Sequence, residues 1–378
     1  MKDRIAAKFQ ELFQTAGIFY ASPGRINLIG EHTDYNGGFV FPGAVDKGIL
    51  AEIRPNGTGK VRVYALDLDE TAEFGLREED KPVESWAHYV FGVCREVLKR
   101  GGKVEGFDAV FAGDVPLGAG MSSSAALEST FAFALNDLFN DNSIEKFELA
   151  RIGQSTEHNY CGVNCGIMDQ FASVFGRKGH LMRLDCRSSE FEYFPFDPSQ
   201  HGYRLVLLNS CVKHALVGSP YNDRRASCER VAAVLGQEFL RGADMDRLEA
   251  VRDRISEEDY KRARYVIGEE KRVLDVCEAL EKGDYETVGA RMYETHWGMS
   301  RDYEVSCEEL DFLAEIAQKC GVTGSRIMGG GFGGCTINLV KEEIYERFIR
   351  QARLGFAARY GHEPKVIDVV ISDGSRRL

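Results

Sequence analysis

Residues 116–126 read Pro116-Leu117-Gly118-Ala119-Gly120-Met121-Ser122-Ser123-Ser124-Ala125-Ala126. They follow an apolar run at 107–113 that is typical of a strand, and they precede an apolar run at 127–135 that is typical of a helix. Small residues between a strand and a helix let backbone N–H groups approach an anion, and the helix dipole adds about half a positive charge at the same place. The stretch therefore predicts an anion-binding loop, with phosphate as the expected ligand.

The composition limits the kinds of protein that this chain can be. Its 378 residues favour about two domains, and its 44% of hydrophobic residues is enough for ordinary cores. With 47 basic and 59 acidic residues the net charge is −12, which disfavours a nucleic-acid or anionic-membrane partner. The first residues predict an amphipathic helix rather than a signal peptide, and no apolar run approaches the roughly 20 residues that span a bilayer. Ten scattered cysteines without a secretory signal predict reduced thiols in a cytoplasmic protein.

A second unusual stretch occupies residues 24–38. Strand-like sequence stops there and polar residues follow, with Arg25, Glu31, His32 and Asp34 all within ten positions. Such a run is typical of a solvated turn, because Asp, Asn and Gly are turn formers. Carboxylates and an imidazole can also orient the hydroxyls of a sugar. The residue types alone therefore leave both a turn and a sugar site open.

Three further positions allow two interpretations each. Trp86 and Tyr89 lie on an expected helix, where aromatic residues belong either to the core or to an adenine pocket. Asp169 stands among apolar residues, either as the cap of the next helix or as a functional carboxylate.

A third stretch, 326–335, carries five glycines in six positions, namely Gly329, Gly330, Gly331, Gly333 and Gly334. Three of them fit Gly-x-Gly-x-x-Gly, but a dinucleotide fingerprint needs a helix after it, and residues 335–340 predict a strand. The glycines instead predict a close approach of this backbone to another loop or to a ligand. No Gly-x4-Gly-Lys-Ser/Thr run occurs in the chain, which excludes a Walker-type nucleotide site.

The order of the expected elements favours an α+β fold over a doubly wound sheet. The strands come in groups, without regular alternation with helices. Residues 48–54 and 60–66 predict two strands joined by a hairpin-type turn at 55–59. The charged helices expected between residues 221 and 282 are interpreted as solvated.

We expect two α+β domains. The first spans 1–195 and carries the polar stretch and the phosphate loop, and the second spans 196–378 and carries the glycine-rich stretch. The boundary is soft, between residues 185 and 205, because no Pro- or Ser-rich linker marks it. The last strand, 365–372, can pack back on the first domain.

Together, the three stretches resemble the motifs of one enzyme family. Residues 24–38 closely resemble the galactokinase signature, and residues 116–126 resemble the phosphate loop of the GHMP small-molecule kinases. Residues 326–335 resemble the third motif of that superfamily. The phosphate loop is shared by the whole superfamily, whereas the fifteen-position first motif is specific to galactokinases.

This resemblance implies a two-domain GHMP-kinase-like architecture with the active site in the interdomain cleft. It implies ATP-dependent phosphorylation of the C1 hydroxyl of α-D-galactose to galactose 1-phosphate, the first committed step of galactose utilisation in the Leloir pathway. The partners would be galactose and ATP, and the cofactor would be Mg²⁺. A monomer is expected rather than an oligomer.

The resemblance also implies a role for each matched residue. Sugar hydroxyls would be held by Glu31, His32, Asp34, Gly166, Asp169 and Tyr221. ATP would be held by Trp86, Tyr89, Pro116, Leu117, Gly118, Ala119, Gly120, Met121, Ser122, Ser123, Ser124 and Ala125. The catalytic pair would be Asp169 and Arg25, and the magnesium ligands would be Ser124 and Glu157. The glycines of the third motif, Gly329, Gly330, Gly331, Gly333 and Gly334, would be structural.

The chemistry of the implied catalytic pair is consistent with that reaction. A carboxylate within reach of a hydroxyl can accept its proton as the phosphoryl group arrives, an effect of roughly 10²–10⁴-fold. A guanidinium beside Asp169 keeps that carboxylate ionised and offsets charge on the transferring group. The resemblance leaves open whether Asp169 is a general base or stabilises charge.

Other functions share some of these motifs. An N-acetylgalactosamine or uronate-sugar kinase would share the phosphate loop, but Thr33 and residues 36–38 favour plain galactose. A non-catalytic sensor of galactose and ATP would lose residues of the serine run at 122–124, which is complete here. Homoserine and mevalonate kinases would lack the run at 31–34. Met121 replaces the family's usual Leu, which is a volume-conserving change.

Overall fold

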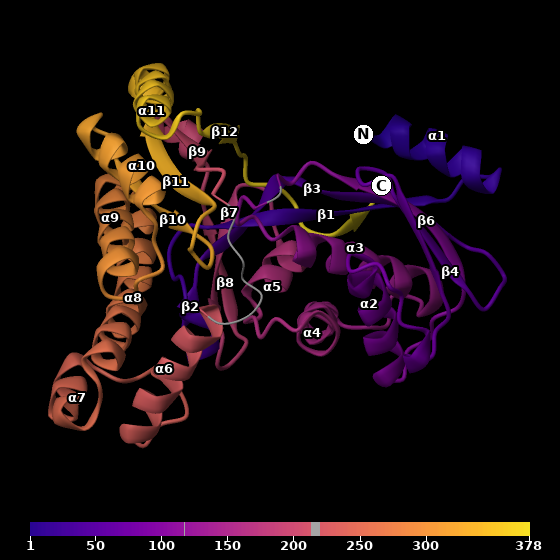
Figure 1. Cartoon of the computed structure of the whole chain (residues 1–378), viewed down its shortest axis with the longest axis horizontal. Helices are drawn as coiled ribbons and strands as arrows, with labels where there is room; N and C mark the ends of the chain where they lie inside the picture. The colour runs from indigo at the N-terminus through magenta and orange to yellow at the C-terminus, as the bar shows by residue number, and fades with distance from the viewer. Residues whose placement is uncertain (117, 213–219) are drawn as a thin grey trace.

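The computed structural model describes residues 1–116, 118–212 and 220–378, and the chain forms two lobes of helices and strands (Figure 1). The first lobe is built on a six-stranded sheet and the second on a four-stranded sheet. The expected α+β class is confirmed. No helix in the described part of the chain is both long and apolar enough to cross a bilayer.

The sheet of the first lobe has the strand order β13-β1-β3-β6-β4-β5. Its strands are β1 (Ile18–Asn27), β3 (Pro42–Pro55), β4 (Val61–Ala65), β5 (Glu70–Phe74), β6 (Phe107–Gly113) and β13 (Arg376–Arg377). The long antiparallel pair of β1 and β3 keeps its register except between Pro23 and Arg25. That irregularity lies where the polar stretch of the sequence begins.

The expected hairpin between residues 48–54 and 60–66 is wrong. Both strands form, but β6 inserts between them, antiparallel to β3 and parallel to β4. Gly106, just before β6, occupies the turn: its N–H donates to the Thr58 carbonyl at 3.0 Å, and its carbonyl accepts from the Asn56 N–H at 3.1 Å. Local turn residues could not reveal this, because the inserted strand comes from much later in the chain.

Helices cover both faces of this sheet. One face carries α1 (Lys2–Phe13), whose buried Ile5 and Phe9 pack against Val110 and Ala112. The other face carries α2 (Ala87–Lys99), α3 (Ser123–Phe139), α4 (Lys146–Thr156) and α5 (Met168–Phe175), as Figure 1 shows. The last turn of α4 continues into a π-helical turn, Glu157–Cys161.

The sheet of the second lobe has the order β10-β11-β9-β12. Its strands are β9 (Tyr203–Asn209), β10 (Gly324–Met328), β11 (Cys335–Lys341) and β12 (Lys365–Asp368). One face packs on α8 (Glu257–Glu281) and α9 (Tyr285–Arg301), and the other packs on α10 (Glu308–Lys319) and α11 (Tyr345–Tyr360). Because both faces are covered, β9 is apolar on both sides. Beyond α8 lie α6 (Pro220–Val234) and α7 (Met245–Ala250).

Two features connect the lobes. A small sheet consists of β2 (Phe39–Val40), β7 (His180–Asp185) and β8 (Phe191–Pro195). After β12 the chain returns to the first lobe: Ile371 bridges Val45, and β13 pairs with β1. The two chain ends therefore lie on the same lobe (Figure 1). The division at residue 195 falls between β8 and β9, and it remains a proposal because the chain crosses the boundary again at its end.

Candidate active site

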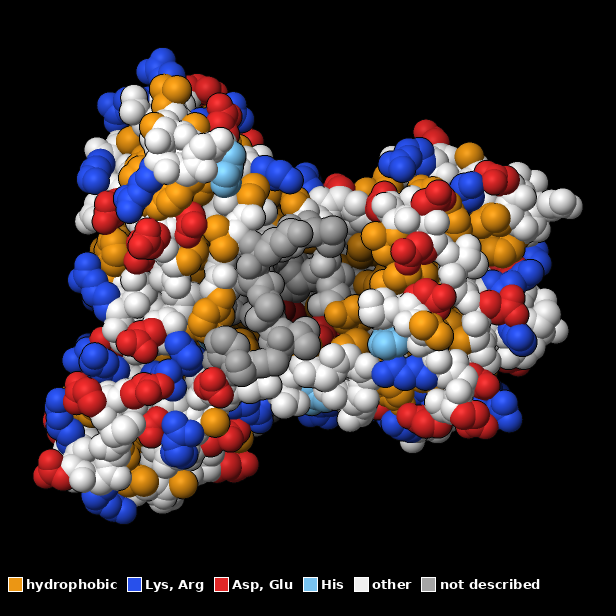
Figure 2. Space-filling model, viewed as in Figure 1, with side chains coloured by type: hydrophobic (Ala, Val, Ile, Leu, Met, Phe, Trp, Pro, Cys, Tyr) orange, Lys and Arg blue, Asp and Glu red, His pale blue; other side chains and the backbone are white. Residues whose placement is uncertain are grey.

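The lobes meet at a cavity of about 260 Å³. In Figure 2 the molecule narrows between two lobes. The predicted site residues that line the cavity are Arg25, Glu31, His32, Asp34, Tyr89, Pro116, Gly118, Ala119, Gly120, Met121, Ser122, Ser123, Ser124, Glu157, Gly166, Asp169, Tyr221, Gly329, Gly330, Gly331 and Gly333. Trp86, Ala125 and Gly334 are not among its lining residues, and Leu117 lies outside the described residues. All three motifs thus meet at one cavity.

The phosphate loop ends at the N-terminus of α3, as predicted. Ser122 has a φ of +57°, in the left-handed region that residues other than glycine seldom adopt, and α3 begins at the next residue. The first N–H groups of a helix have no partners within it. Ser123 and Ser124 line the cavity, so the amides at this end of α3 are placed to bind an anion there.

The glycine-rich motif packs directly on the phosphate loop. A Cβ added at Gly120 would lie 2.9 Å from the Met328 carbonyl oxygen, and one added at Gly331 would lie 2.2 Å from the Val305 carbonyl oxygen. The expectation that these glycines permit a close approach of backbones is confirmed. The contact brings the phosphate loop of one lobe against a loop of the other.

Asp169 lies at the centre of the polar groups in the cavity. Its Oδ1 accepts a hydrogen bond from Nε of Arg25 at 2.8 Å, and its Oδ2 accepts one from the hydroxyl of Ser122. Arg25 also donates to the carbonyl of Gly120. The cap position of α5 is held by Ile167, so the interpretation of Asp169 as a helix cap is wrong. One carboxylate therefore joins β1, α5 and the phosphate loop.

Asp34 lies beside this group and has an unusual environment. Burial disfavours its charged form and Asp169 repels it, which together raise the pKa of Asp34 to about 7, although the N–H of Tyr35 donates to it at 2.9 Å. A Cβ added at Gly166 would lie 1.7 Å from Oδ2 of Asp34. Only glycine fits there, because the carboxyl group of Asp34 occupies the space of any side chain.

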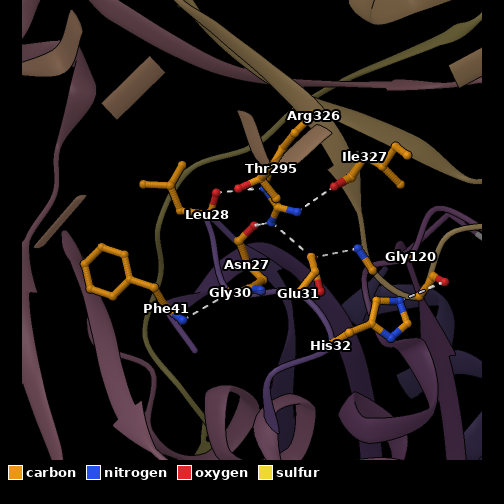
Figure 3. A network of polar contacts seen from close by, with 12 residues as sticks. Asn27, Leu28, Gly30, Glu31, His32, Phe41, Gly120, Thr295, Arg326 and Ile327 are labelled. Carbon is orange, nitrogen blue, oxygen red and sulfur yellow. Dashed lines mark hydrogen bonds and ion pairs between the residues drawn. The ribbon is translucent and has the colours of Figure 1, made fainter. Parts of the chain in front are cut away.

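Glu31 is held by the second lobe, as Figure 3 shows. Its Oε1 accepts from Nη2 of the fully buried Arg326 at 3.0 Å and from the N–H of Gly329 at 2.8 Å. Burial alone would raise the pKa of Glu31, but the guanidinium groups of Arg326 and Arg25 and the Gly329 amide lower it below its ordinary value. The carboxylate is therefore charged at neutral pH.

Arg326 also binds the end of β1. Its Nε donates to the Leu28 carbonyl at 2.8 Å, and its Nη2 donates to the Asn27 carbonyl. Its Nη1 donates to the carbonyl of Ile327 at 2.6 Å. In Figure 3 the guanidinium lies between Asn27 and Leu28 on one side and Ile327 on the other. A single buried side chain thus joins the polar stretch at 24–38 to the glycine-rich stretch at 326–335.

His32 is fixed in one tautomer by its neighbours. The Gly330 carbonyl, 3.2 Å from Nε2, can only accept, so Nε2 carries the proton and Nδ1 accepts from the Tyr35 hydroxyl at 2.7 Å. Tyr35 has then used its only proton, and it accepts from the Tyr303 hydroxyl at 2.8 Å. Burial lowers the pKa of His32 to about 4, so the ring is neutral near pH 7. The ring of Tyr221 lies 5.4 Å from the His32 ring.

Glu157 and Ser124 face each other from different helices. Burial raises the pKa of Glu157 to about 7; a hydrogen bond from the Ser124 side chain acts in the opposite direction, and the charge of Asp169 adds to the rise. Glu128, one turn further along α3, is also buried, and burial and the charge of Glu157 raise its pKa well above the ordinary value. The carboxyl groups of Glu128, Glu157 and Asp169 therefore interact with one another near the N-terminus of α3.

Several residues of the site carried no recognisable signal in the sequence. Glu269 accepts from the N–H of Gly30 at 2.8 Å and from the Thr295 hydroxyl at 2.7 Å, and it is fully buried. The interpretation of the charged helices as solvated is wrong at this residue. Tyr303 and Glu269 have ordinary helical or loop surroundings in the sequence, whereas Arg326 could have been suspected, because it stands alone as a charge in an apolar strand.

Comparison with known proteins first identifies the class of enzyme that has this fold. The N-terminal domain of GHMP kinases matches residues 88–177, and their C-terminal domain matches residues 277–355. The fold is similar to that of Methanococcus jannaschii mevalonate kinase, with a TM-score of 0.66, 17% identity and coverage of 95% of this chain and 100% of that one. The chain has the two-domain architecture of a GHMP kinase.

More similar proteins identify the family. The galactokinase galactose-binding signature matches residues 7–55. The galactokinase of Thermotoga neapolitana is 38% identical over 358 residues, which are 94% of this chain and 99% of that protein. The galactokinase of Clostridium acetobutylicum is 38% identical over 383 residues, which are 98% and 97% of the two chains. The structure of Lactococcus lactis galactokinase complexed with galactose has a TM-score of 0.93 and 35% identity, and it covers 99% of this chain and 98% of that one. The chain belongs to the galactokinase family.

Proposed function

We propose that this chain transfers the γ-phosphoryl group of ATP to the C1 hydroxyl of α-D-galactose, giving galactose 1-phosphate. The observation that carries the proposal is the position of Asp169. Its carboxylate bonds to Arg25 on one side and to Ser122 of the phosphate loop on the other. A hydroxyl bound beside it would therefore be within reach of both a proton acceptor and the phosphate-binding amides.

The sugar would lie against the residues of the first motif. Asp34, Gly166 and Tyr221 line the same cavity as Asp169 and offer a carboxyl group, a backbone and a phenol. Glu31 has one oxygen engaged by Arg326 and Gly329, which leaves Oε2 for a hydroxyl. Both ring nitrogens of His32 already have protein partners, so His32 would reach the sugar only by exchanging one of them.

ATP would lie along residues 116–125, with its phosphates at the N-terminus of α3. Tyr89 lines the cavity near this end and would contact the adenine side of the nucleotide. Trp86 stands one turn earlier, where its indole N–H donates to Glu70 at 2.7 Å. We infer that Trp86 contacts the outer end of the bound nucleotide.

In the reaction, Asp169 would accept the proton of the C1 hydroxyl, and the Arg25 guanidinium would orient the carboxylate through its hydrogen bond. Arg25 would also offset negative charge on the phosphoryl group in transit. Closure of the cavity by the two lobes would exclude water, which otherwise competes with the sugar as the acceptor.

Ser124 and Glu157 have the donor chemistry of a magnesium site. Mg²⁺ prefers oxygen ligands and is commonly bound by one or two protein groups together with substrate phosphates. The described residues contain no group of three or more His, Cys, Asp or Glu that could hold a metal alone, which matches a cation shared with ATP. When bound, the ion would neutralise phosphate charge, while Glu157 and Ser124 would hold it at the phosphate loop.

Thr33 and residues 36–38 distinguish galactose from related sugars only indirectly. The Thr33 hydroxyl donates to the Phe39 carbonyl at 2.6 Å, and Asn36 donates to the His32 carbonyl at 2.8 Å. These residues shape the loop that carries Glu31 and Asp34. We further propose a monomer that acts in the cytoplasm, where ATP is available and its ten unpaired cysteines stay reduced.

The substitution Asp169→Asn tests the proposed chemistry. We expect galactose affinity to change by less than about threefold, because Asn keeps an oxygen for Arg25, and kcat to fall by about 100-fold or more. Turnover is measured with a coupled ADP assay and galactose binding by calorimetry. The exposed Asp246→Asn is the matched control and keeps wild-type turnover.

A sugar panel tests the substrate. Wild-type protein is assayed with galactose, N-acetylgalactosamine, glucose and 2-deoxygalactose. A preference of about tenfold or more for another sugar would refute the assignment of galactose, and binding without turnover of any sugar would indicate a sensor. Near-normal kcat in Asp169→Asn would remove this residue from the chemistry.

A further inference from the structure

A buried polar pair lies directly behind the candidate active site. Glu128 is on α3, one turn after Ser124, and Gln170 is on α5, next to Asp169. Nε2 of Gln170 donates to Oε2 of Glu128 at 3.0 Å, and the two residues are 1% exposed or less. Neither side chain lines the cavity, so the pair does not touch a ligand bound there.

A third helix packs closely against this pair. A Cβ added at Gly153 of α4 would lie 2.7 Å from Cγ of Gln170 and 3.2 Å from Oε2 of Glu128. The last turn of α4 runs on into the turn that begins with Glu157. The three helices also pack on one another, beneath the six-stranded sheet in Figure 1.

The position of the pair has a geometric consequence. Each of the three helices carries one proposed functional group: Ser124 is in the first turn of α3, Glu157 follows α4, and Asp169 is in the first turn of α5. A change in the spacing of these helices would move the phosphate-binding amides relative to the proton acceptor. Misplacement of reacting groups by about 1 Å can cost on the order of 10²-fold in rate.

Folding alone gives no reason for a carboxyl group at this place. Glu128 Oε1 and Gln170 Oε1 are both buried without a hydrogen-bond partner among the described residues. An unpartnered buried polar atom destabilises the folded state, and two well-packed apolar side chains would avoid that cost. The pair is therefore better explained by a requirement for geometry than by a gain in stability.

We propose that Glu128, Gln170 and Gly153 form a clamp that sets the spacing of α3, α4 and α5, so that Glu128 is a positioning residue for phosphoryl transfer. The inference rests on the proposed function, because it assumes the roles given to Ser124, Glu157 and Asp169. The clamp acts through hydrogen bonding and packing. It requires an oxygen at residue 128 that accepts a hydrogen bond from Gln170. It also requires that residue 153 have no side chain, because a Cβ there would collide with Gln170.

Two variants at residue 128 separate this role from a role of its charge. Glu128→Gln keeps an acceptor oxygen in the same place, so we expect kcat to fall by less than about threefold. Glu128→Ala leaves the Gln170 amide without its partner, and we expect kcat to fall by about 10- to 100-fold, while KM for galactose and ATP changes by less than about threefold. If both variants lose activity equally, the charge of Glu128 is required, and the clamp is refuted.

Gly153→Ala and Gln170→Leu test the same geometry from the other two helices. Each is expected to lower kcat and spare both KM values, and the loss in the double variant Glu128→Ala/Gln170→Leu should be close to that of one single variant, because they remove one interaction. If Glu128→Ala does not fold, as judged by circular dichroism and urea unfolding, these two variants decide the question. Unchanged kcat in both would overturn the proposal.

The wild-type protein separates the two levels of inference. If it does not phosphorylate galactose, the proposed function fails before the clamp is tested. If it does, and kcat is unaffected by Glu128→Ala, only the clamp fails.

Discussion

His32 illustrates how neighbours decide the state of a single residue. A histidine in a polar run would ordinarily titrate near neutral pH, but here burial lowers its pKa to about 4, and hydrogen bonds from Tyr35 and to Gly330 determine its tautomer. The carboxylate of Asp169, in contrast, accepts hydrogen bonds from Arg25 and Ser122. At the residue scale, the site consists of groups whose protonation is controlled by burial and by partners from both lobes.

The effect of burial on the pKa of a carboxyl group also predicts a pH-dependent affinity for magnesium. Burial raises the pKa of Glu157 to about 7 in the protein without metal. Below that pH the carboxyl group carries a proton that a cation must displace, so we expect Mg²⁺ affinity with ATP present to fall by up to about tenfold per pH unit between pH 7 and 5 and to level off above pH 8. Magnesium titrations of activity across this range measure the effect.

Glu157→Gln provides the test of the residue assignment. We expect it to raise the magnesium concentration required for half-maximal activity and to remove the pH dependence. The exposed Glu105→Gln is the control and should behave as wild type. An unchanged magnesium requirement in Glu157→Gln would contradict its role as a ligand.

At the scale of elements, the site depends on contacts between segments far apart in the sequence. Arg326 of β10 binds the end of β1, and Glu269 of α8 binds the amide of Gly30 in the loop that follows. Both side chains are fully buried. The polar loop of the first motif is therefore shaped by a strand and a helix of the second lobe, as Figure 3 shows for Arg326.

Removal of Arg326 should destabilise the whole protein. Arg326→Met leaves the Glu31 carboxylate buried without its ion-pair partner, and we expect the free energy of unfolding to fall by about 3–5 kcal/mol. Urea unfolding followed by fluorescence measures it. Arg204→Met is the control, because its ion pair with Glu342 is largely exposed, and the expected loss is about 1 kcal/mol or less. Equal losses in the two variants would contradict the interpretation.

At the scale of the whole molecule, the C-terminal segment ties the lobes together. After β12 in the second lobe the chain crosses to the first, where the Ser375 hydroxyl lies 2.8 Å from that of Ser22 and the Gly374 N–H donates to the Gly176 carbonyl at 2.8 Å. The cavity lies between the parts that this segment connects. The residues of the C-terminal segment belong to none of the three motifs, yet their bonds to the first lobe restrict how the lobes can separate.

Deletion of residues 374–378 tests whether the C-terminal segment stabilises the connection between the lobes. The deletion removes β13 and the hydrogen bonds of Ser375. Because each hydrogen bond contributes about 1 kcal/mol and a few are lost, we expect the free energy of unfolding to fall by about 2–4 kcal/mol. Thermal and urea unfolding measure the change. Arg376→Ala keeps the backbone pairing and should stay within about 0.5 kcal/mol of wild type. A deletion variant as stable as wild type would show that the segment is dispensable.

The sequence by itself identified the residues that meet at the candidate active site. The small residues at 116–126, the polar run at 24–38 and the glycines at 329–334 are local signals, because turn geometry, helix N-termini and close backbone approach leave residue types that can be recognised in the chain. The grouping of the expected strands, without regular alternation with helices, predicted the α+β class. Family resemblance to galactokinases rested on the same stretches, and the comparisons confirm it.

Only the tertiary structure decided the pairing of strands and the partners of the buried charges. The insertion of β6 between β3 and β4 and the burial of Glu269 depend on segments distant in the sequence, whose contacts leave no local periodicity. For the same reason Glu128 and Gln170, 42 positions apart, could not be paired from the sequence. Hydrogen bonds between distant residues form only after the chain has folded, so the sequence named the proposed reacting groups and the fold determined their spacing.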